Sequence, residues 1–340
     1  MATNILRAAI IGCGAISKNH AATLADADYA SIVALCDIDA KKAEGRREQF
    51  APNAAVYTDW RKMLDEAEID VVHICTPHDL HVEMACECLT RGIHVYLEKP
   101  IAISETELAR LEAVAAASSA KITVSFQNRR IVQNRLFADL VEKEGGPVVA
   151  RGMVTWVRDR AYYTADDWHG VLAREGGGLM INQAIHNLDM LLSVFPERVL
   201  SVRGSVDLYD NEEFSEVEDN AHFLVNLEGG KRIAFFGTNN YPVDAPIFYE
   251  VRTASGARIT GMDGHIYRNG VRMDTDENLP KNDGKACWGY GHRICIREFY
   301  EACRDGGEVP VPLASAARTM RVIFALYRSN GKTAPLTEPS

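Results

Sequence analysis

The sequence predicts an α/β Rossmann domain followed by an α+β domain with a large, mainly antiparallel open sheet. Three observations lead to this fold class. Short β-type runs alternate with amphipathic helical patterns in the first third of the chain, a glycine pair follows the first of these runs, and after Phe126 the β-type runs follow one another with fewer helices between them. We therefore expect two domains, residues 1–126 and 127–340, with the closing helices able to pack back on the first domain. A chain of 340 residues is long for one core and comfortable for two.

The first domain is predicted to hold a parallel sheet. Its β-type runs are "RAAIIGCG", "SIVALCDI", "VVHICTP", "HVYLEKP" and "KITVSF". Helical patterns fit between them, for example over residues 16–27 and 81–91. Strand, helix and strand repeated in this way indicate parallel strands joined by right-handed crossovers.

The second domain is predicted to be built on antiparallel strands. The runs are "VVARGMVTWV", "VLSVRGSVDLY", "NAHFLVNLE", "KRIAFFGTN" and "FYEVRTA". A turn signal at Glu228-Gly229-Gly230 separates two of them, which is typical of neighbouring antiparallel strands. Two helical patterns, over residues 294–303 and 314–329, close the chain.

The composition limits the classes of partner, location and metal site that we expect. The net charge is -10 and the basic residues are interspersed with acids, which argues against nucleic acid or an anionic membrane as a partner. No apolar run approaches membrane-spanning length, and the chain enters a strand pattern without a cleavable leader, so we expect a cytoplasmic protein. The eight cysteines are scattered, and Cys86 and Cys88 are too close together for ordinary zinc ligands. We expect a reducing compartment and no structural metal.

A dinucleotide site is predicted where the first strand ends. The turn into the next helix supplies the candidate contacts Gly12, Gly14, Ala15 and Ile16. Glycines let the chain turn tightly and approach a pyrophosphate, although Ser17 stands where the third glycine of GxGxxG would be. Asp37 ends the second strand, about where an acid binds the adenosine ribose, and no basic residue follows it before Lys41. The pattern favours NAD over NADP; the alternative is an ordinary turn with an acid that caps it.

Two further strand ends belong to the same prediction, because ligands of open α/β sheets lie outside the carboxyl ends of the strands. The candidate cofactor contacts there are Thr76, Pro77, His81, Glu98 and Lys99. Lys99 is the most informative, because a lysine at the carboxyl end of a core strand faces the crevice. The alternatives are that Lys99 is a solvated surface cation and that His81 only caps the following helix.

A polar seam is predicted within "EGGGLMINQAIHNLDML", which begins at Glu175. On an ideal helix, Asn182, His186 and Asp189 fall within about 60° of arc, beside an apolar arc. The seam is either structural or part of an active site.

Six motifs together carry a resemblance to a known family. They are "GCGAISKNH" from Gly12, "TPHDLH" from Thr76, "EKP" from Glu98, "SFQNRR" from Ser125, "GGGLMINQAIHNLD" from Gly176 and "WGYGHRICIREFYEA" from Trp288. The ordered set spans essentially the whole chain and resembles the Gfo/Idh/MocA family of nicotinamide-dependent, mostly sugar-directed oxidoreductases. The resemblance implies that Lys99 lies beside the nicotinamide and the substrate, that a cis peptide bond precedes Pro100, and that His186 is the general acid/base. It also implies a homodimer or homotetramer built through the open sheet.

The proton chemistry suits these residues. Oxidising a secondary alcohol removes a hydroxyl proton while hydride leaves the carbon, and histidine titrates near working pH. A cation such as Lys99 keeps His186 neutral and stabilises developing alkoxide charge. Many members of the family carry Asp where this chain has Asn182, which can donate and accept hydrogen bonds but cannot take a proton. Asp189 either orients the His186 ring or pairs within the core.

The substrate site is predicted from aromatic and basic residues near the seam. Arg158, Tyr163 and Trp168 precede the glycine run in a segment dense in aromatic rings and arginines, which suits a polyol or pyranose. The same segment could instead cover the core or form a subunit interface. Asn128 is a candidate cofactor contact, and Arg129 and His292 are candidates for the pocket wall, with a structural role as the alternative for His292.

The leading functional hypothesis is an NAD-dependent dehydrogenase or reductase that acts on a secondary alcohol or ketone of a sugar, polyol or glycoside. Its catalytic residues are Lys99, His186 and Asn182. One alternative is a glycosidase that retains NAD and uses transient oxidation. Another is a regulator that binds the cofactor without catalysis.

Overall fold

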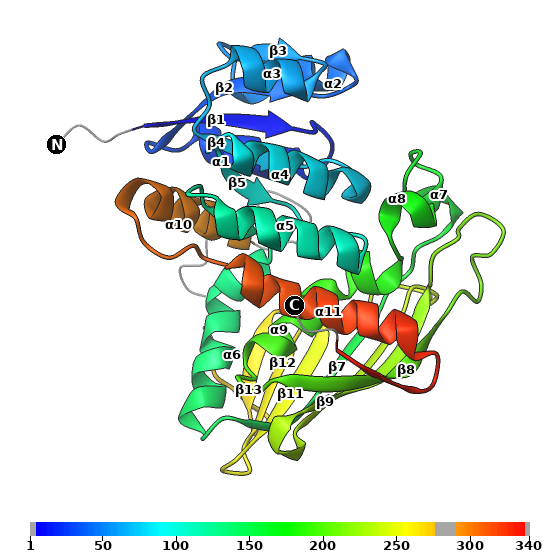
Figure 1. Ribbon diagram of the computed structural model, residues 1–340. Helices are drawn as coiled ribbons and strands as arrows, with labels where there is room; N and C mark the ends of the chain where they lie inside the picture. Colours follow the sequence, from blue (N-terminus) through cyan, green and yellow to red (C-terminus); the bar gives the residue numbers. More distant parts are fainter. Residues whose placement is uncertain (1–4, 276–289, 337–340) are drawn as a thin grey trace. The chain divides into compact units, whose positions relative to one another are not determined.

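The computed structural model describes residues 5–275 and 290–336, which pack as two units (Figure 1). The first unit comprises residues 5–102, 106–130 and 290–314. The second comprises residues 103–105, 131–275 and 315–336. The motif that begins at Trp288 therefore starts outside the described residues.

A six-stranded parallel sheet forms the centre of the first unit, as predicted. The strand order is β3-β2-β1-β4-β5-β6, and every pairing between neighbours is parallel. The strands are β1 (Leu6–Ile11), β2 (Ala30–Cys36), β3 (Ala55–Tyr57), β4 (Val71–Ile74), β5 (His94–Leu97) and β6 (Ile122–Val124). The order reverses between β1 and β4, so both strands end at the switch point where open sheets of this kind bind ligands. The five predicted strands are present, and β3 is an addition.

Helices connect and cover these strands. They are α1 (Ser17–Ala25), α2 (Ala40–Phe50), α3 (Trp60–Glu66), α4 (His81–Thr90), α5 (Glu105–Ala117) and α10 (Gly291–Asp305), with the short 3-10 turns η1 (His78–Leu80) and η2 (Gln127–Arg130). Strands β4, β5 and β6 are almost entirely buried, as strands covered on both faces are. No helix among the described residues is long and apolar enough to cross a membrane.

The second unit is organised around a nine-stranded sheet of order β14-β13-β12-β11-β7-β10-β9-β8-β15. The strands are β7 (Pro147–Thr155), β8 (Val199–Asp207), β9 (Asn220–Leu227), β10 (Arg232–Thr238), β11 (Phe248–Thr253), β12 (Arg258–Met262), β13 (His265–Arg268), β14 (Val271–Arg272) and β15 (Thr333–Pro335). Strands β7 and β10 pair in parallel, and the other pairings are antiparallel. The predicted, mainly antiparallel sheet is thus confirmed, with four strands that the sequence patterns did not indicate.

Helices cover one face of this sheet (Figure 1). Helix α9 packs on β7 and β11, and α6 packs on β12 and β13. The helical segments are α6 (Val132–Lys143), α7 (Arg160–Tyr163), α8 (Leu172–Glu175), the π-helix η3 (Leu179–Gln183), α9 (Ile185–Ser193), the 3-10 turn η4 (Glu228–Gly230) and α11 (Leu313–Ser329). The opposite face exposes the alternate residues of its central strands.

The division into units follows packing more than sequence order. A single boundary after Phe126 is predicted from the sequence, whereas packing groups residues up to 130 with the first unit. Helix α10 also belongs to the first unit, because it packs on α1 and η2, and most of α11 belongs to the second.

Candidate functional site

The glycine turn after β1 has the shape that a dinucleotide requires. Gly12 has φ of +88°, and a Cβ there would lie 2.5 Å from the carbonyl oxygen of Cys75, so only glycine fits. A Cβ on Gly14 would meet no described atom within 4 Å, which leaves the backbone open to a ligand. Helix α1 starts three residues later, so its N-terminus, where anions bind favourably, directly follows the turn. The turn therefore fits the pyrophosphate of a dinucleotide.

The loop is held by two groups that the glycine pattern did not reveal. Ser17, in place of the third glycine, is fully buried and donates through Oγ to the carbonyl of Gly14 at 2.7 Å. Arg46 of α2 donates to the same carbonyl at 3.0 Å and to Ser17 Oγ at 3.2 Å. Ser17 thus supplies a hydrogen bond to the turn that a glycine could not supply.

Asp37 lies beside this turn, where the ribose of the adenosine half is expected. Its Oδ2 accepts from the backbone N–H of Cys13 at 2.7 Å, and its Oδ1 accepts from that of Asp39 at 2.9 Å. The two bonds tie the end of β2 to the glycine turn and aim the carboxylate. Each oxygen keeps a second lone pair, so the same group can also accept from two ribose hydroxyls.

The ends of β4 and β5 are joined by His81. This ring is 0% exposed, with Nδ1 2.7 Å from the carbonyl oxygen of Pro100 and Nε2 3.0 Å from that of Thr76. Burial lowers the pKa of His81, whereas the hydrogen bonds to the two carbonyls raise it, because only the protonated ring can donate to both of them. His81, predicted as a cofactor contact, thus holds together two loops that themselves follow strand ends. The peptide bond between Lys99 and Pro100 is cis, as the resemblance implied.

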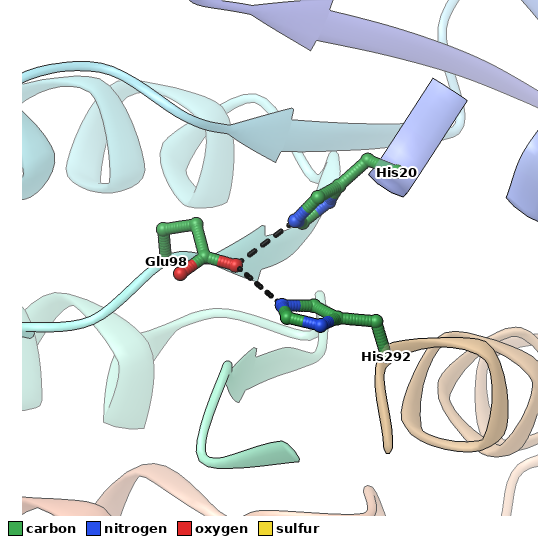
Figure 2. A group of neighbouring side chains, drawn as sticks. All are labelled: His20, Glu98 and His292. Atoms are coloured by element: carbon green, nitrogen blue, oxygen red, sulfur yellow. Dashed lines mark hydrogen bonds and ion pairs between the residues drawn. The ribbon is translucent and has the colours of Figure 1, made fainter. Parts of the chain in front are cut away.

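Glu98 lies at the centre of a buried polar cluster (Figure 2). His20 Nε2 lies 2.9 Å from Glu98 Oε1, and His292 Nε2 lies 3.4 Å from the same oxygen. The other oxygen, Oε2, accepts from the backbone N–H of Lys99 at 3.3 Å. Burial alone would raise the pKa of Glu98, but the contacts with His20 and His292 outweigh it and hold that pKa well below the usual range.

The cluster continues as a directed chain of hydrogen bonds. A carboxylate only accepts, so His20 donates through Nε2 and accepts through Nδ1 from His73 Nδ1, 2.8 Å away. His73 Nε2 then accepts from the Tyr300 hydroxyl at 2.9 Å. Burial lowers the pKa of both histidines, which agrees with neutral rings. Among these four hydrogen-bonded side chains, the carboxylate of Glu98 carries the formal charge, and Glu98 directly precedes Lys99 in sequence.

The same cluster combines side chains of the types that bind metal ions. The ligand atoms of His20, Glu98 and His292 all lie within 4.8 Å of one another. Tetrahedral zinc with bonds of about 2.0–2.1 Å needs ligand atoms roughly 3.3 Å apart. His20 Nε2 and Glu98 Oε1 are closer, 2.9 Å apart, so the geometry is that of a hydrogen bond rather than of two ligands of one metal ion.

Lys99 and the residues after β6 occupy the same carboxyl edge of the parallel sheet. Lys99 is half-buried directly after β5. Asn128 and Arg129 lie half-buried on η2, after β6, and the Arg129 guanidinium lies over the Phe126 ring at 5.7 Å from its centroid. The residues predicted for the nicotinamide half thus follow neighbouring strands of one sheet.

The seam of the second unit lies on a π turn followed by an α-helix, which corrects the continuous helix of the sequence projection. Leu179–Gln183 form the π-helix η3, and Ala184 N–H donates to the Leu179 carbonyl at 2.7 Å. Asn182 therefore lies on the π turn, whereas His186 lies on the first turn of α9; both are half-buried. π turns are rare and are frequent at functional sites.

Buried acids hold this turn. Glu218 accepts from the N–H groups of Gly178 at 2.7 Å and Met180 at 3.0 Å, and from the Tyr327 hydroxyl at 2.8 Å. Glu175 accepts from Asn182 Nδ2 at 2.7 Å. The helical projection found neither acid, although Glu175 is the first letter of the quoted motif.

Two roles are considered above for Asp189, orienting the His186 ring and pairing within the core, and its burial bears on the choice. It is 1% exposed, and its Oδ1 accepts from the Thr319 hydroxyl of α11 at 2.8 Å. This contact supports pairing within the core.

The segment before the glycine run packs on itself and on residues 239–244 of the second unit. Arg158 pairs with Asp244 at 3.0 Å and lies over the Trp156 ring, 4.9 Å from its centroid. Tyr163 is 2% exposed and its hydroxyl accepts from Asn239, so this predicted substrate contact lies in the core. Trp168 is half-buried and contacts the His169 ring, with centroids 3.7 Å apart. Arg158 and Trp168 are thus the more accessible members of this predicted set.

Comparison with known proteins agrees with this geometry. Residues 6–126 match the family model described as "Oxidoreductase family, NAD-binding Rossmann fold", and residues 142–266 match the "GFO/IDH/MocA C-terminal domain". Similar proteins include D-glucoside 3-dehydrogenase of Escherichia coli, 30% identical over 57% of this chain and 55% of that protein. The myo-inositol 2-dehydrogenase of Thermotoga maritima is 25% identical over 79% of this chain and 77% of that protein. The first of these matches spans little more than half of the relative's length.

Solved structures show the same fold. The WlbA dehydrogenase of Chromobacterium violaceum, in complex with NADH and UDP-GlcNAcA, has a TM-score of 0.85 and 24% identity, with 99% of this chain and 97% of that chain covered. A myo-inositol 2-dehydrogenase from Lactobacillus plantarum has a TM-score of 0.82 and 18% identity, with 98% of this chain and all of that chain covered. The chain belongs to the GFO/IDH/MocA oxidoreductase family, with that family's NAD-binding Rossmann domain followed by its C-terminal domain.

Proposed function

We propose that this protein is an NAD-dependent dehydrogenase that transfers hydride between the nicotinamide and a secondary alcohol or ketone of a sugar, polyol or glycoside. The observation that carries the proposal is the series Gly12, Asp37 and Lys99, which follow β1, β2 and β5 at one edge of a parallel sheet. The relatives named as glucoside and inositol dehydrogenases support the substrate class. The proposed setting is a reducing cytoplasm, in which the buried cysteine thiols stay reduced.

The cofactor is proposed to bind along this edge. The expected contacts are the backbone of the glycine turn, the Asp37 carboxylate and the loops after β4, β5 and β6: Gly12, Gly14, Ala15, Ile16, Asp37, Thr76, Pro77, Lys99 and Asn128. His81 and Glu98 contribute by holding two of these loops. A carboxylate at Asp37 repels a 2′-phosphate, so NAD is expected to bind more tightly than NADP.

The proton chemistry is assigned to the chain's own residues. Bound NAD supplies the hydride acceptor. His186 takes the hydroxyl proton, because imidazole titrates near neutral pH. Lys99 donates a hydrogen bond to the reacting oxygen and stabilises its developing negative charge. Asn182 accepts a hydrogen bond from the substrate and takes no proton.

The substrate is proposed to be recognised by basic and aromatic side chains. Arg129 and Arg158 offer planar forks that suit adjacent hydroxyls, and Trp168 offers a ring face. Tyr163 and His292 are buried, so we assign them to the support of neighbouring groups.

The test follows NADH absorbance over a panel of sugars and polyols with four proteins: wild type, His186→Ala, Lys99→Ala and Asp37→Ala. We expect His186→Ala and Lys99→Ala each to lose about 10²- to 10⁴-fold in kcat. His186→Ala should bind NAD normally, and Lys99→Ala should keep most of its NAD affinity, because the other cofactor contacts remain. Asp37→Ala should weaken NAD binding and reduce the preference over NADP. A fifth protein, Val271→Ala, alters a side chain that is 66% exposed on the edge strand β14 and is the control.

The same assay separates the competing functions. Stoichiometric accumulation of NADH supports a dehydrogenase, whereas glycoside cleavage without net NADH indicates the glycosidase. Tight NAD binding with an inert panel would reject the dehydrogenase proposal.

A further inference from the structure

A buried carboxylate, that of Glu175, is hydrogen-bonded to the side chain of Asn182. Glu175 ends α8, and its side chain is 0% exposed. Its Oε1 accepts from Asn182 Nδ2 at 2.7 Å, and its Oε2 accepts from the backbone N–H of Gly170 at 2.6 Å. Both oxygens therefore face N–H donors, which favours the ionised form of the acid.

This contact determines which way the Asn182 amide points. Nδ2 has two hydrogens, one directed to Glu175 and the other to the Tyr162 hydroxyl at 3.1 Å. An ionised carboxylate cannot donate, so the amide cannot exchange its nitrogen and oxygen ends while Glu175 is charged. The remaining atom, Oδ1, can only accept.

We propose that Glu175 is a positioning residue of the reaction: it holds the Asn182 amide so that Oδ1 accepts a hydroxyl hydrogen of the substrate. An amide that donates to a carboxylate is polarised, which makes its carbonyl oxygen a stronger acceptor. Asn182 precedes His186 by four residues, across the junction of η3 and α9. The proposal rests on the proposed dehydrogenase function, because it assigns a role in substrate binding at the same site.

The pair also explains why an amide stands at position 182. An aspartate there would bring a second carboxylate to hydrogen-bond distance of Glu175. Two such groups cannot both ionise at little cost, so one of them would hold a proton near neutral pH. In this chain the charge lies one hydrogen bond further from the substrate, on Glu175.

The first arm of the test needs no substrate. In Asn182→Asp, the folded pair binds a proton that the unfolded chain releases, so stability should rise as pH falls. We expect the Tm of this variant, relative to wild type, to rise by about 2–4 °C between about pH 7 and pH 5. The swap Asn182→Asp/Glu175→Gln has one carboxylate and should lose this dependence.

A matched control separates the pair from the general effect of the substitution. Asn226→Asp places the same change on β9, where the amide donates to the Ser201 hydroxyl at 3.2 Å. A hydroxyl can reverse that bond, so the Tm of Asn226→Asp should follow the wild-type pH profile.

The second arm measures kinetics on a substrate identified by the panel. Glu175→Gln cannot accept from both Gly170 and Asn182, so the amide is released, and we expect kcat/KM to fall about 10- to 100-fold with NAD affinity unchanged. In the swap, the introduced glutamine would accept from Gly170 and donate to the introduced aspartate. The swap should therefore recover most of the lost kcat/KM and add an acidic limb to its pH profile.

The outcomes are distinct. Wild-type kcat/KM in folded Glu175→Gln, or a wild-type pH profile of Tm in Asn182→Asp, would overturn the proposal. If Glu175→Gln does not fold, the swap and Asn182→Asp still decide it. If the whole panel is inert, the dehydrogenase proposal fails by itself, while the Tm arm still shows whether Glu175 is charged and holds Asn182.

Discussion

At the residue scale, the buried histidines of the first unit carry a consequence for acid stability. His20 and His73 are fully buried and neutral in the folded chain, and burial lowers the pKa of both. The unfolded chain takes up protons on these rings below about pH 6.5, whereas the folded chain resists protonation. The pKa of Glu98 is lower in the folded state than in the unfolded state, so the unfolded chain protonates this carboxyl first as pH falls. Glu98 therefore contributes a further loss of stability at lower pH.

Stability should therefore fall as pH drops below about 6.5, with a slope of at most about 1.4 kcal/mol per pH unit for each histidine. His73→Gln should reduce this slope between about pH 6.5 and pH 5, because one buried titrating ring is gone. Denaturant unfolding at several pH values measures it. Val271→Gln, at a position on β14 that is 66% exposed, should keep the wild-type slope. An unchanged slope in His73→Gln would contradict the assignment.

What the sequence could predict at this scale depends on how local the pattern is. Gly12, Asp37 and Lys99 were predictable because each follows a strand in a motif of a few letters. The contact of His20 with Glu98 joins residues 78 apart, and that of His73 with Tyr300 joins residues 227 apart. Nothing in a local pattern marks such pairs, since burial and partner are set by the tertiary fold.

At the scale of one element, the turn between β1 and α1 contains two glycines for which we expect different roles, one in folding and one in cofactor binding. Gly12→Ala would put a Cβ 2.5 Å from the Cys75 carbonyl oxygen at a φ of +88°, so the backbone must shift. We expect a loss of at least about 2–3 kcal/mol of unfolding free energy. Gly14→Ala meets no described atom and should leave Tm unchanged while weakening NAD binding about tenfold or more, because the methyl occupies the ligand's space.

Thermal unfolding with and without NAD distinguishes the two variants. Equal Tm losses in both would show that Gly14 is also structural. Normal NAD affinity in Gly14→Ala would remove the turn from the cofactor site.

The same scale shows where helical periodicity fails. The projection assumed one regular helix for the apolar run after the glycines, but the first turn of that run, Leu179–Gln183, is π. At Gly177 the φ is +149° and a Cβ would lie 2.1 Å from the Tyr327 hydroxyl, so α11 imposes the break. The seam could be predicted as a set of residues, but its geometry depends on contacts with Glu218 and Tyr327, which are remote in sequence.

At the scale of the whole molecule, the open face of the nine-stranded sheet predicts self-association. Met153 and Phe236 are paired on neighbouring strands β7 and β10 and are 40% and 45% exposed, and Leu224 on β9 is 43% exposed. Exposed apolar side chains on three neighbouring strands indicate an interaction site, and a sheet face opposed to its own copy gives a self-complementary interface.

We expect a homodimer or homotetramer at micromolar concentration, with this face buried between subunits. The double variant Met153→Lys/Phe236→Glu should shift the mass measured by light scattering toward the monomer, because it places charges in the centre of the patch, where desolvation is costly. Val271→Glu, which alters a side chain 66% exposed on the edge strand β14, should leave the mass unchanged. A wild-type monomer, or a double variant that keeps the wild-type mass, would assign the patch to another partner.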